Sequence, residues 1–196
     1  MNRNTIVLLS IAGVLLLTVL WGVGRYNSLV ALSEGTEAQW ANVESSYQRR
    51  SDLIPNLVNT VKGYADFEKS TLQAVVEARA NATSMKIDPT QLTPEKLAAF
   101  QKAQSGVSGA LGRLLVTVEK YPDLKANQNF LELQSQLEGT ENRINVERNR
   151  FNEVVRSFNT AIKRFPTNII ASMGGYSAKG YFEAEESAAE APKVAF

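Results

Sequence analysis

A run of 19 residues without a charged side chain, Thr5 to Val23, constrains the fold of this chain more than any other feature. Twelve of these residues are Leu, Ile or Val, and the run has no polar face, so it does not fit a half-buried helix of a soluble core. As an α-helix it is about 28 Å long, close to the roughly 30 Å hydrocarbon thickness of a bilayer. The sequence therefore predicts a transmembrane helix over residues 5–23, after a short tail at residues 1–4.

A cleaved signal peptide is the main alternative for the same run. Against it, the apolar stretch is longer than the usual signal core, and no small-x-small cleavage site follows it. Trp21 near the end of the run, with Arg25 after it, is typical of a helix end at the membrane interface. We therefore predict a retained anchor in which the bilayer contacts Thr5, Leu8, Leu15, Leu20, Trp21 and Val23.

The residues that flank the anchor bear on its orientation and stiffness. Arg3 and the amino terminus lie on one side, and Arg25 alone lies close on the other. By the positive-inside rule this balance favours a cytoplasmic N-terminus and a domain outside the cytoplasm. No Pro separates the anchor from the next helix, so the two are expected to form one nearly continuous rod, hinged only at Gly22 and Gly24.

Beyond the anchor, apolar residues recur every three or four positions over four stretches, at about 27–50, 54–82, 94–120 and 124–165. Thr93 followed by Pro94 is a helix start signal, and Pro122 and Pro166 end the third and fourth stretches. Short connections and one apolar stripe per helix predict an all-α fold, an antiparallel up-and-down bundle of about four long helices. The bundle domain is assigned to residues 24–183, and the Ala- and Glu-rich residues 184–196 are expected to be a flexible tail.

The composition excludes several kinds of chemistry. Cysteine and histidine are both absent, which removes thiolate nucleophiles, imidazole bases and most zinc and haem ligands. A di-iron carboxylate bundle also needs histidine. The net charge of +1 gives no basic footprint for nucleic acid. We therefore assign no catalytic, cofactor-binding or metal-binding residue, and we expect no cofactor, no nucleic-acid partner and no enzymatic activity.

Several long motifs stand out along the chain: residues 48–58 (QRRSDLIPNLV) with 61–65 (VKGYA), residues 121–130 (YPDLKANQNF), residues 165–168 (FPTN) and residues 181–183 (YFE). Together these motifs resemble the LemA family of proteins. The resemblance covers Gly24 to about Glu183 and implies a bacterial single-pass membrane protein with a helical bundle and no established activity. It marks as structural or interaction residues Arg49, Arg50, Asp52, Pro55, Asn56, Tyr64, Tyr121, Pro122, Asp123 and Asn127.

The first motif has two structural interpretations. In the favoured one, Pro55 lies in the first turn of a new helix and Asp52 accepts hydrogen bonds from its free amides. In the other, the motif is a kink in one long helix. One of the two arginines before the proline then pairs with a carboxylate of the fourth stretch, such as Glu138 or Glu141.

Asn145, Asn152 and Asn159 recur every seven residues beside the aromatic stripe of the fourth stretch. We favour a half-exposed polar border for them; the alternative is a device that fixes register within the bundle or between protomers.

Gly106, Gly109 and Gly112 recur every three residues in the third helix. Each destabilises a helix by about 1 kcal/mol relative to Ala, so we expect them to mark a close helix approach, or otherwise a flexible stretch.

Taken together, these features predict a self-associating scaffold or adaptor in the bacterial inner (cytoplasmic) membrane. Its bundle domain is expected on the periplasmic rather than the cytoplasmic side of that membrane. Its partners would be the lipid bilayer, further copies of the chain to form a homo-oligomer, and another membrane protein. The alternative function is a regulator or presenter for a membrane enzyme such as a protease, since genes of the LemA family often lie near those of membrane proteases.

Overall fold

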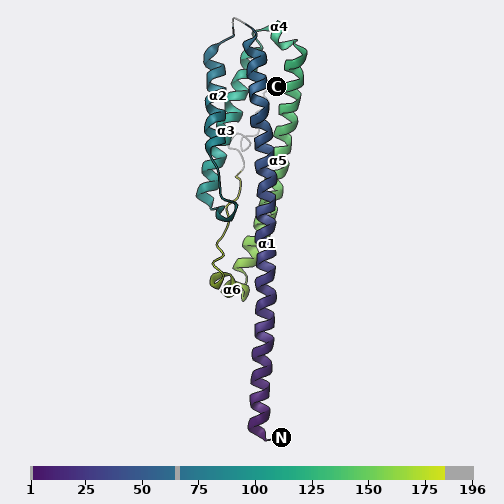
Figure 1. Ribbon diagram of the computed structural model, residues 1–196, viewed down its shortest axis with the longest axis vertical. Coiled ribbons are helices and arrows are strands. Elements are labelled where there is room, and N and C mark those ends of the chain that lie inside the picture. The colour runs from purple at the N-terminus through teal and green to yellow at the C-terminus, as the bar shows by residue number, and fades with distance from the viewer. Residues whose placement is uncertain (1, 65–66, 184–196) are drawn as a thin grey trace, which may run out of the picture.

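The computed structural model describes residues 2–64 and 67–183, and its main feature is one helix, α1 (Arg3–Lys62), of 60 residues. At 1.5 Å per residue this helix is about 90 Å long. Its N-terminal part has a mean hydropathy of 2.6 with none of that segment buried, which makes α1 long and apolar enough to cross a membrane. That part extends below the other helices without a neighbour (Figure 1). The expected continuous rod is confirmed, because α1 runs through Gly22 and Gly24 without interruption.

The upper part of α1 belongs to a helical bundle. The other elements are α2 (Lys69–Ser84), a 3-10 turn (Pro89–Gln91), α3 (Pro94–Val118), α4 (Pro122–Lys125), α5 (Gln128–Lys163) and α6 (Thr167–Met173). The long helices α1, α2, α3 and α5 alternate in direction, with α5 alongside α1 and α3 alongside α2 (Figure 1). The residues that the structure describes contain no strand, so the predicted all-α bundle is confirmed.

Two helix starts have side-chain caps, but two predicted boundaries differ. Thr93 accepts a hydrogen bond from the Lys96 amide and Asn127 accepts one from the Phe130 amide, so both cap their helices. The predicted second helix at 54–82 is wrong, because α1 continues to Lys62 and α2 begins only at Lys69. The prediction that Pro55 begins a helix is therefore also wrong. The predicted fourth helix at 124–165 is divided, because α4 ends at Lys125 and α5 begins only at Gln128.

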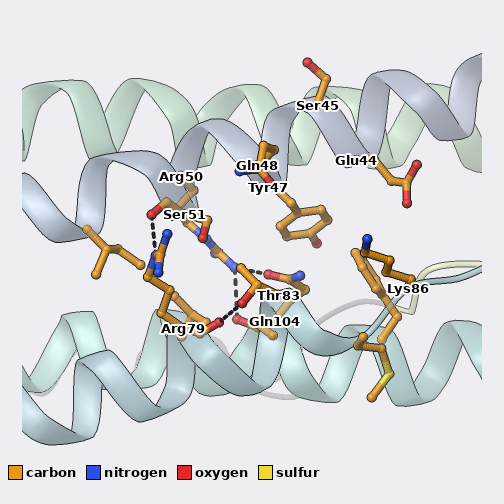
Figure 2. A pocket seen from close by; sticks show the side chains of 15 residues that line it. Glu44, Ser45, Tyr47, Gln48, Arg50, Ser51, Arg79, Thr83, Lys86 and Gln104 are labelled. Atoms are coloured by element: carbon orange, nitrogen blue, oxygen red, sulfur yellow. Dashed lines mark hydrogen bonds between the residues drawn. The ribbon is translucent and has the colours of Figure 1, made fainter.

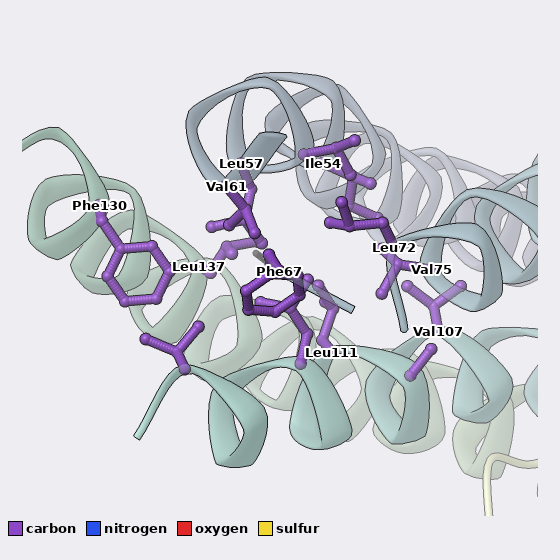
Figure 3. Packing of buried hydrophobic residues seen from close by; sticks show 14 of the residues in the cluster. Ile54, Leu57, Val61, Phe67, Leu72, Val75, Val107, Leu111, Phe130 and Leu137 are labelled. Atoms are coloured by element: carbon purple, nitrogen blue, oxygen red, sulfur yellow. The ribbon is translucent and has the colours of Figure 1, made fainter. Parts of the chain in front are cut away.

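Three apolar clusters lie one above another along the bundle. The distal cluster joins the end of α1 to α2, α3 and the start of α5 (Figure 3), and includes Ile54, Leu57, Val61, Phe67, Leu72, Val75, Val107, Leu111, Phe130 and Leu137. The middle cluster is aromatic and centres on Trp40, Tyr47, Phe100, Phe151 and Phe182. The basal cluster, nearest the free part of α1, contains Leu29, Phe158, Ile162 and Ala171.

The three glycines of α3 do not mark a close helix approach. A Cβ atom added at Gly106 or Gly112 would have no neighbour within 4 Å, and one at Gly109 would meet only the Arg113 side chain at 4.0 Å. All three face outward. The close-packing prediction is wrong because the apolar stripe of α3, not the glycine stripe, turns toward the bundle.

Candidate functional site

A buried arginine separates the distal cluster from the middle cluster. The Arg50 side chain is only 2% exposed. Its Nη1 donates to Glu141 Oε2 at 2.9 Å and to Ser108 Oγ at 2.8 Å, and its Nη2 donates to the carbonyl and the side-chain oxygen of Gln104. We call Arg50 with these three partners the Arg50 layer. It joins α1 to α3 and α5, and it contains the pairing with Glu141 that one interpretation of the motif anticipated.

Arg79 of α2 explains why α1 passes through Pro55. Proline has no amide hydrogen, so the carbonyl four residues earlier, that of Ser51, loses its helical partner. The Arg79 Nε atom donates to this carbonyl at 2.7 Å and replaces the missing bond (Figure 2). The proline thus creates an acceptor inside the bundle, and α2 is attached to α1 through it.

A pocket of about 390 Å³ opens beside the Arg50 layer, between α1, α2 and α3 (Figure 2). Glu44 and Lys86 face each other at one end; burial raises the pKa of the Glu44 carboxyl, an effect that Trp40 and Lys86 partly offset. The hydroxyl of Ser51, which lines the pocket, is buried and has no hydrogen-bond partner within the described residues. A pocket of this size and mixed charge can accommodate a small polar molecule.

A second buried cation separates the middle cluster from the basal cluster. Lys179 is 7% exposed, and its ammonium group donates to the hydroxyls of Thr36 and Ser33 and lies 3.5 Å from Glu37. We call this group the Lys179 layer. Burial lowers the pKa of Lys179, although Glu37 and Glu34 act in the opposite direction. The two Glu side chains and both hydroxyls come from α1, while the lysine comes from the end of the described chain.

Lys179 belongs to a segment without regular structure, residues 176–183, which we call the C-terminal strap. Asn159 both donates to the Lys179 carbonyl and accepts from the Lys179 amide, and Asn152 bonds the backbone of Phe182 in the same way. Gln101 of α3 holds the backbone of Glu183 with a third such pair. Asn152 and Asn159 are seven residues apart on a helix, and their partners Phe182 and Lys179 are three residues apart in extended chain. Both separations span about 10 Å, so the heptad spacing of the asparagines matches the spacing of the backbone groups that they bind.

One glycine lets the strap approach α3. The Gly180 amide donates to the Leu92 carbonyl at 2.9 Å, and a Cβ atom there would lie 2.8 Å from the Pro94 Cα. Any side chain at this position would push the strap away from the start of α3.

The sequence profile of the LemA family matches residues 39–196, which is more than half of the chain. The chain belongs to the LemA family. The resemblance drawn from the motifs is thereby confirmed.

Several of the similar proteins are named for the magnetosome. Magnetosome protein MamQ 2 of Paramagnetospirillum magneticum and magnetosome protein MamQ of Magnetospirillum gryphiswaldense are each 28% identical over 187 residues, covering 87% of this chain and 68% of their own length. Protein LemA of Metamycoplasma hominis is 26% identical over 122 residues, which covers 62% of this chain and 52% of that protein.

The LemA motif residues fall into separate groups. Of the residues that the resemblance marks within 48–58, only Arg50 reaches the bundle interior; the side chains of Arg49, Asp52, Pro55 and Asn56 are exposed. Asp52 accepts from Gln48 on the same helix and caps no helix start, as the uninterrupted α1 requires.

The other motif residues gather at the distal end of the bundle. The Tyr64 hydroxyl donates to the Asp123 carbonyl at 3.4 Å and accepts from the Asn127 amide at 3.2 Å. The ring of Tyr121 lies 5.1 Å from that of Phe67, and Pro122 begins α4. This motif therefore builds the turn that joins α3 to α5.

The remaining predicted residues divide between the anchor and α5. The predicted anchor residues are all exposed along α1: Thr5, Leu8, Leu15, Leu20, Trp21 and Val23. Asn159 is buried, Asn152 is half-buried and Asn145 is exposed. The sequence did not point to Lys179 or Gln101, because a single lysine or glutamine carries no periodic signal.

Proposed function

We propose that this LemA-family chain is a non-enzymatic scaffold that holds a rigid helical bundle at a bacterial membrane. The observation that carries the proposal is the uninterrupted α1, in which the apolar segment and the bundle share one helix. A flexible tether would let the domain rotate freely, whereas a continuous helix fixes the height and direction of the bundle against the bilayer. The relatives' names mention no reaction, which supports a structural role.

Self-association is the form of scaffolding that we favour. Confinement to a membrane raises the effective concentration of the chains, so modest interfaces suffice for assembly. We also propose the inner membrane as the location, with the bundle outside the cytoplasm, from the charges that flank the anchor.

Chemical crosslinking in native membranes, followed by affinity purification, tests the scaffold. We expect dimers or larger homo-oligomers. A strictly monomeric chain would contradict self-association, and a foreign membrane protein recovered in equal amount would instead support a regulator of a membrane enzyme such as a protease.

The rod itself is tested with two insertions after Tyr26. Seven helix-forming residues add about two turns and preserve the register, whereas seven Gly and Ser residues break the rigid connection. We expect crosslinked oligomers to persist with the helical insert and to weaken with the flexible one. Equal crosslinking of both variants would show that the continuity of α1 does not matter for assembly.

Sidedness has a simple test, because the chain has no cysteine. A single Val116→Cys variant places a thiol on the exposed face of α3. We expect a membrane-impermeant maleimide to label it in spheroplasts; labelling only after lysis would place the bundle in the cytoplasm.

A further inference from the structure

The base of the bundle carries an apolar surface that no described residue covers. Phe165 is 81% exposed, Ile169 53% and Met173 85%, and they recur every four residues at and within α6. The opposite side of α6 packs on the basal cluster through Ile170 and Ala171. One side of this short helix is therefore held by the bundle, while large apolar side chains project from the other.

This surface lies level with the end of the membrane anchor. The ring of Tyr176, just after α6, is 6.3 Å from that of Tyr26 on α1. Tyr26 is three residues beyond Val23, which corresponds to about 4.5 Å along the helix axis. The headgroup region on each side of a bilayer is roughly 5–7 Å thick. Figure 1 shows α6 as the lowest element of the bundle, next to the point where α1 becomes solitary.

The charges around this surface favour lipid. Lys163 and Arg164 directly precede Phe165 and are exposed, and Arg25 is exposed on the neighbouring turn of α1, with its guanidinium 5.8 Å from the Trp21 ring. Basic side chains beside large apolar ones bind membrane surfaces that contain anionic lipids.

We propose that α6 with Phe165 is a second membrane contact, which inserts Phe165, Ile169 and Met173 into the headgroup region of the leaflet from which α1 emerges. The proposal rests on the proposed function in that α1 must span the bilayer. Two contacts, the anchor and α6, fix the rotation of the bundle about the axis of α1, which a single helix leaves free. A second copy of the chain fits this surface less well, because three side chains bury far less than the roughly 1,000 Å² that a specific protein interface needs.

Depth-dependent quenching tests the contact in the full-length chain, which has no native cysteine to interfere. Single-cysteine variants Ile169→Cys and Met173→Cys are labelled with an environment-sensitive fluorophore and reconstituted in vesicles of phosphatidylcholine and phosphatidylglycerol at about 3:1. Part of the phosphatidylcholine is brominated on its acyl chains. Val116→Cys, 70% exposed on α3, is the control outside the membrane, and Leu15→Cys is the control inside it.

We expect strong quenching at position 15, clear quenching at 169 and 173, and none at 116. Quenching at 15 without quenching at 169 and 173 overturns the α6 contact and leaves the anchor intact. No quenching at 15 shows instead that the anchor itself, and with it the proposed function, is wrong. Self-quenching between labels at 173 without lipid quenching assigns the surface to a second copy and also overturns the proposal.

The basic residues give a second measurement that does not depend on the labelled helix. In the Lys163→Ser/Arg164→Ser background, we expect quenching at 173 to fall by at least half in the anionic vesicles, and quenching at 15 to stay unchanged. Equal quenching at 173 with and without these charges would contradict the role assigned to anionic lipid.

Discussion

Arg50 and Lys179 are the two buried cations among the described residues, and they lie about four helical turns apart along α1, since Lys179 contacts Thr36. Each lies between two apolar clusters. Arg50 belongs to a helix, and its partners are on two other helices. Lys179 belongs to the C-terminal strap, which asparagine side chains hold against α5. The Arg50 layer is part of the helical bundle itself, so we expect it to open only when helices separate, whereas we expect the Lys179 layer to open while the helices stay packed.

The largest effect is expected from breaking the Arg50 layer. Glu141→Leu leaves a buried guanidinium without its carboxylate, which should lower the free energy of unfolding by about 3 kcal/mol. The double variant Arg50→Met/Glu141→Leu removes the buried charge as well and should lie within about 1 kcal/mol of the wild type. Denaturant unfolding followed by circular dichroism in detergent micelles measures both.

Glu138→Leu is the matched control, because this exposed residue lies about one turn away on the same helix. It should change stability by less than about 0.5 kcal/mol. A double variant as unstable as Glu141→Leu alone would show that the layer stabilises the bundle through its hydrogen bonds rather than through charge compensation.

Breaking the Lys179 layer should have a local effect on the strap. Asn159→Leu leaves the backbone amide and carbonyl of Lys179 without hydrogen-bond partners. We expect this to destabilise the closed strap by about 2 kcal/mol, which raises the equilibrium constant for strap opening roughly thirtyfold. We expect hydrogen exchange of the strap amides to rise by this factor, with no matching change in global unfolding. Equal losses of strap protection and global stability would mean that the two layers unfold together.

Much of the fold followed from the sequence because it depends on local patterns. The uncharged run and the unbroken helical spacing predict the rod, and Thr93 before Pro94 predicts the start of α3. The motif also allowed an arginine paired with Glu141, since charged residues inside a bundle need partners.

The failures at Pro55 and at the asparagine repeat have a common physical cause, which is bonding to residues distant in the chain. Pro55 looked like a helix start because its missing amide hydrogen breaks most helices, but Arg79 supplies the replacement bond from α2. The asparagine repeat was recognised, yet its partner was not, because the strap has no periodic pattern of its own. The tail expected at residues 184–196 lies outside the described residues.

A smaller effect is expected one heptad before Asn159. Asn152→Leu removes the two hydrogen bonds to Phe182, whose ring stays packed against Trp40. Because Asn152 is half-buried, water can replace part of the lost hydrogen bonding. We expect the closed strap to lose about 1 kcal/mol of stability, which makes hydrogen exchange at the Phe182 amide roughly fivefold faster.

Asn145→Leu is the control for this variant, since Asn145 occupies the same heptad position but is exposed. It should leave strap exchange unchanged. If Asn152→Leu instead changes the size of the assembly and leaves strap exchange as it was, the asparagines fix register between protomers and not within one.

The smallest effect is a pH dependence of the strap. Burial lowers the pKa of Lys179, so near its shifted pKa the closed strap binds fewer protons than the open strap, whose lysine titrates near 10.5. The state that binds fewer protons gains as the pH rises, so closure should become more favourable as the pH rises toward the ordinary lysine value near 10.5. In Lys179→Met this dependence should disappear.

The mobility of a spin label at Ala178→Cys, an exposed strap position, reports the opening of the strap in both the wild-type and the Lys179→Met backgrounds. A wild-type strap that loosens relative to Lys179→Met over this range would show that attraction to Glu37 outweighs burial, and Glu37→Gln should then abolish the loosening.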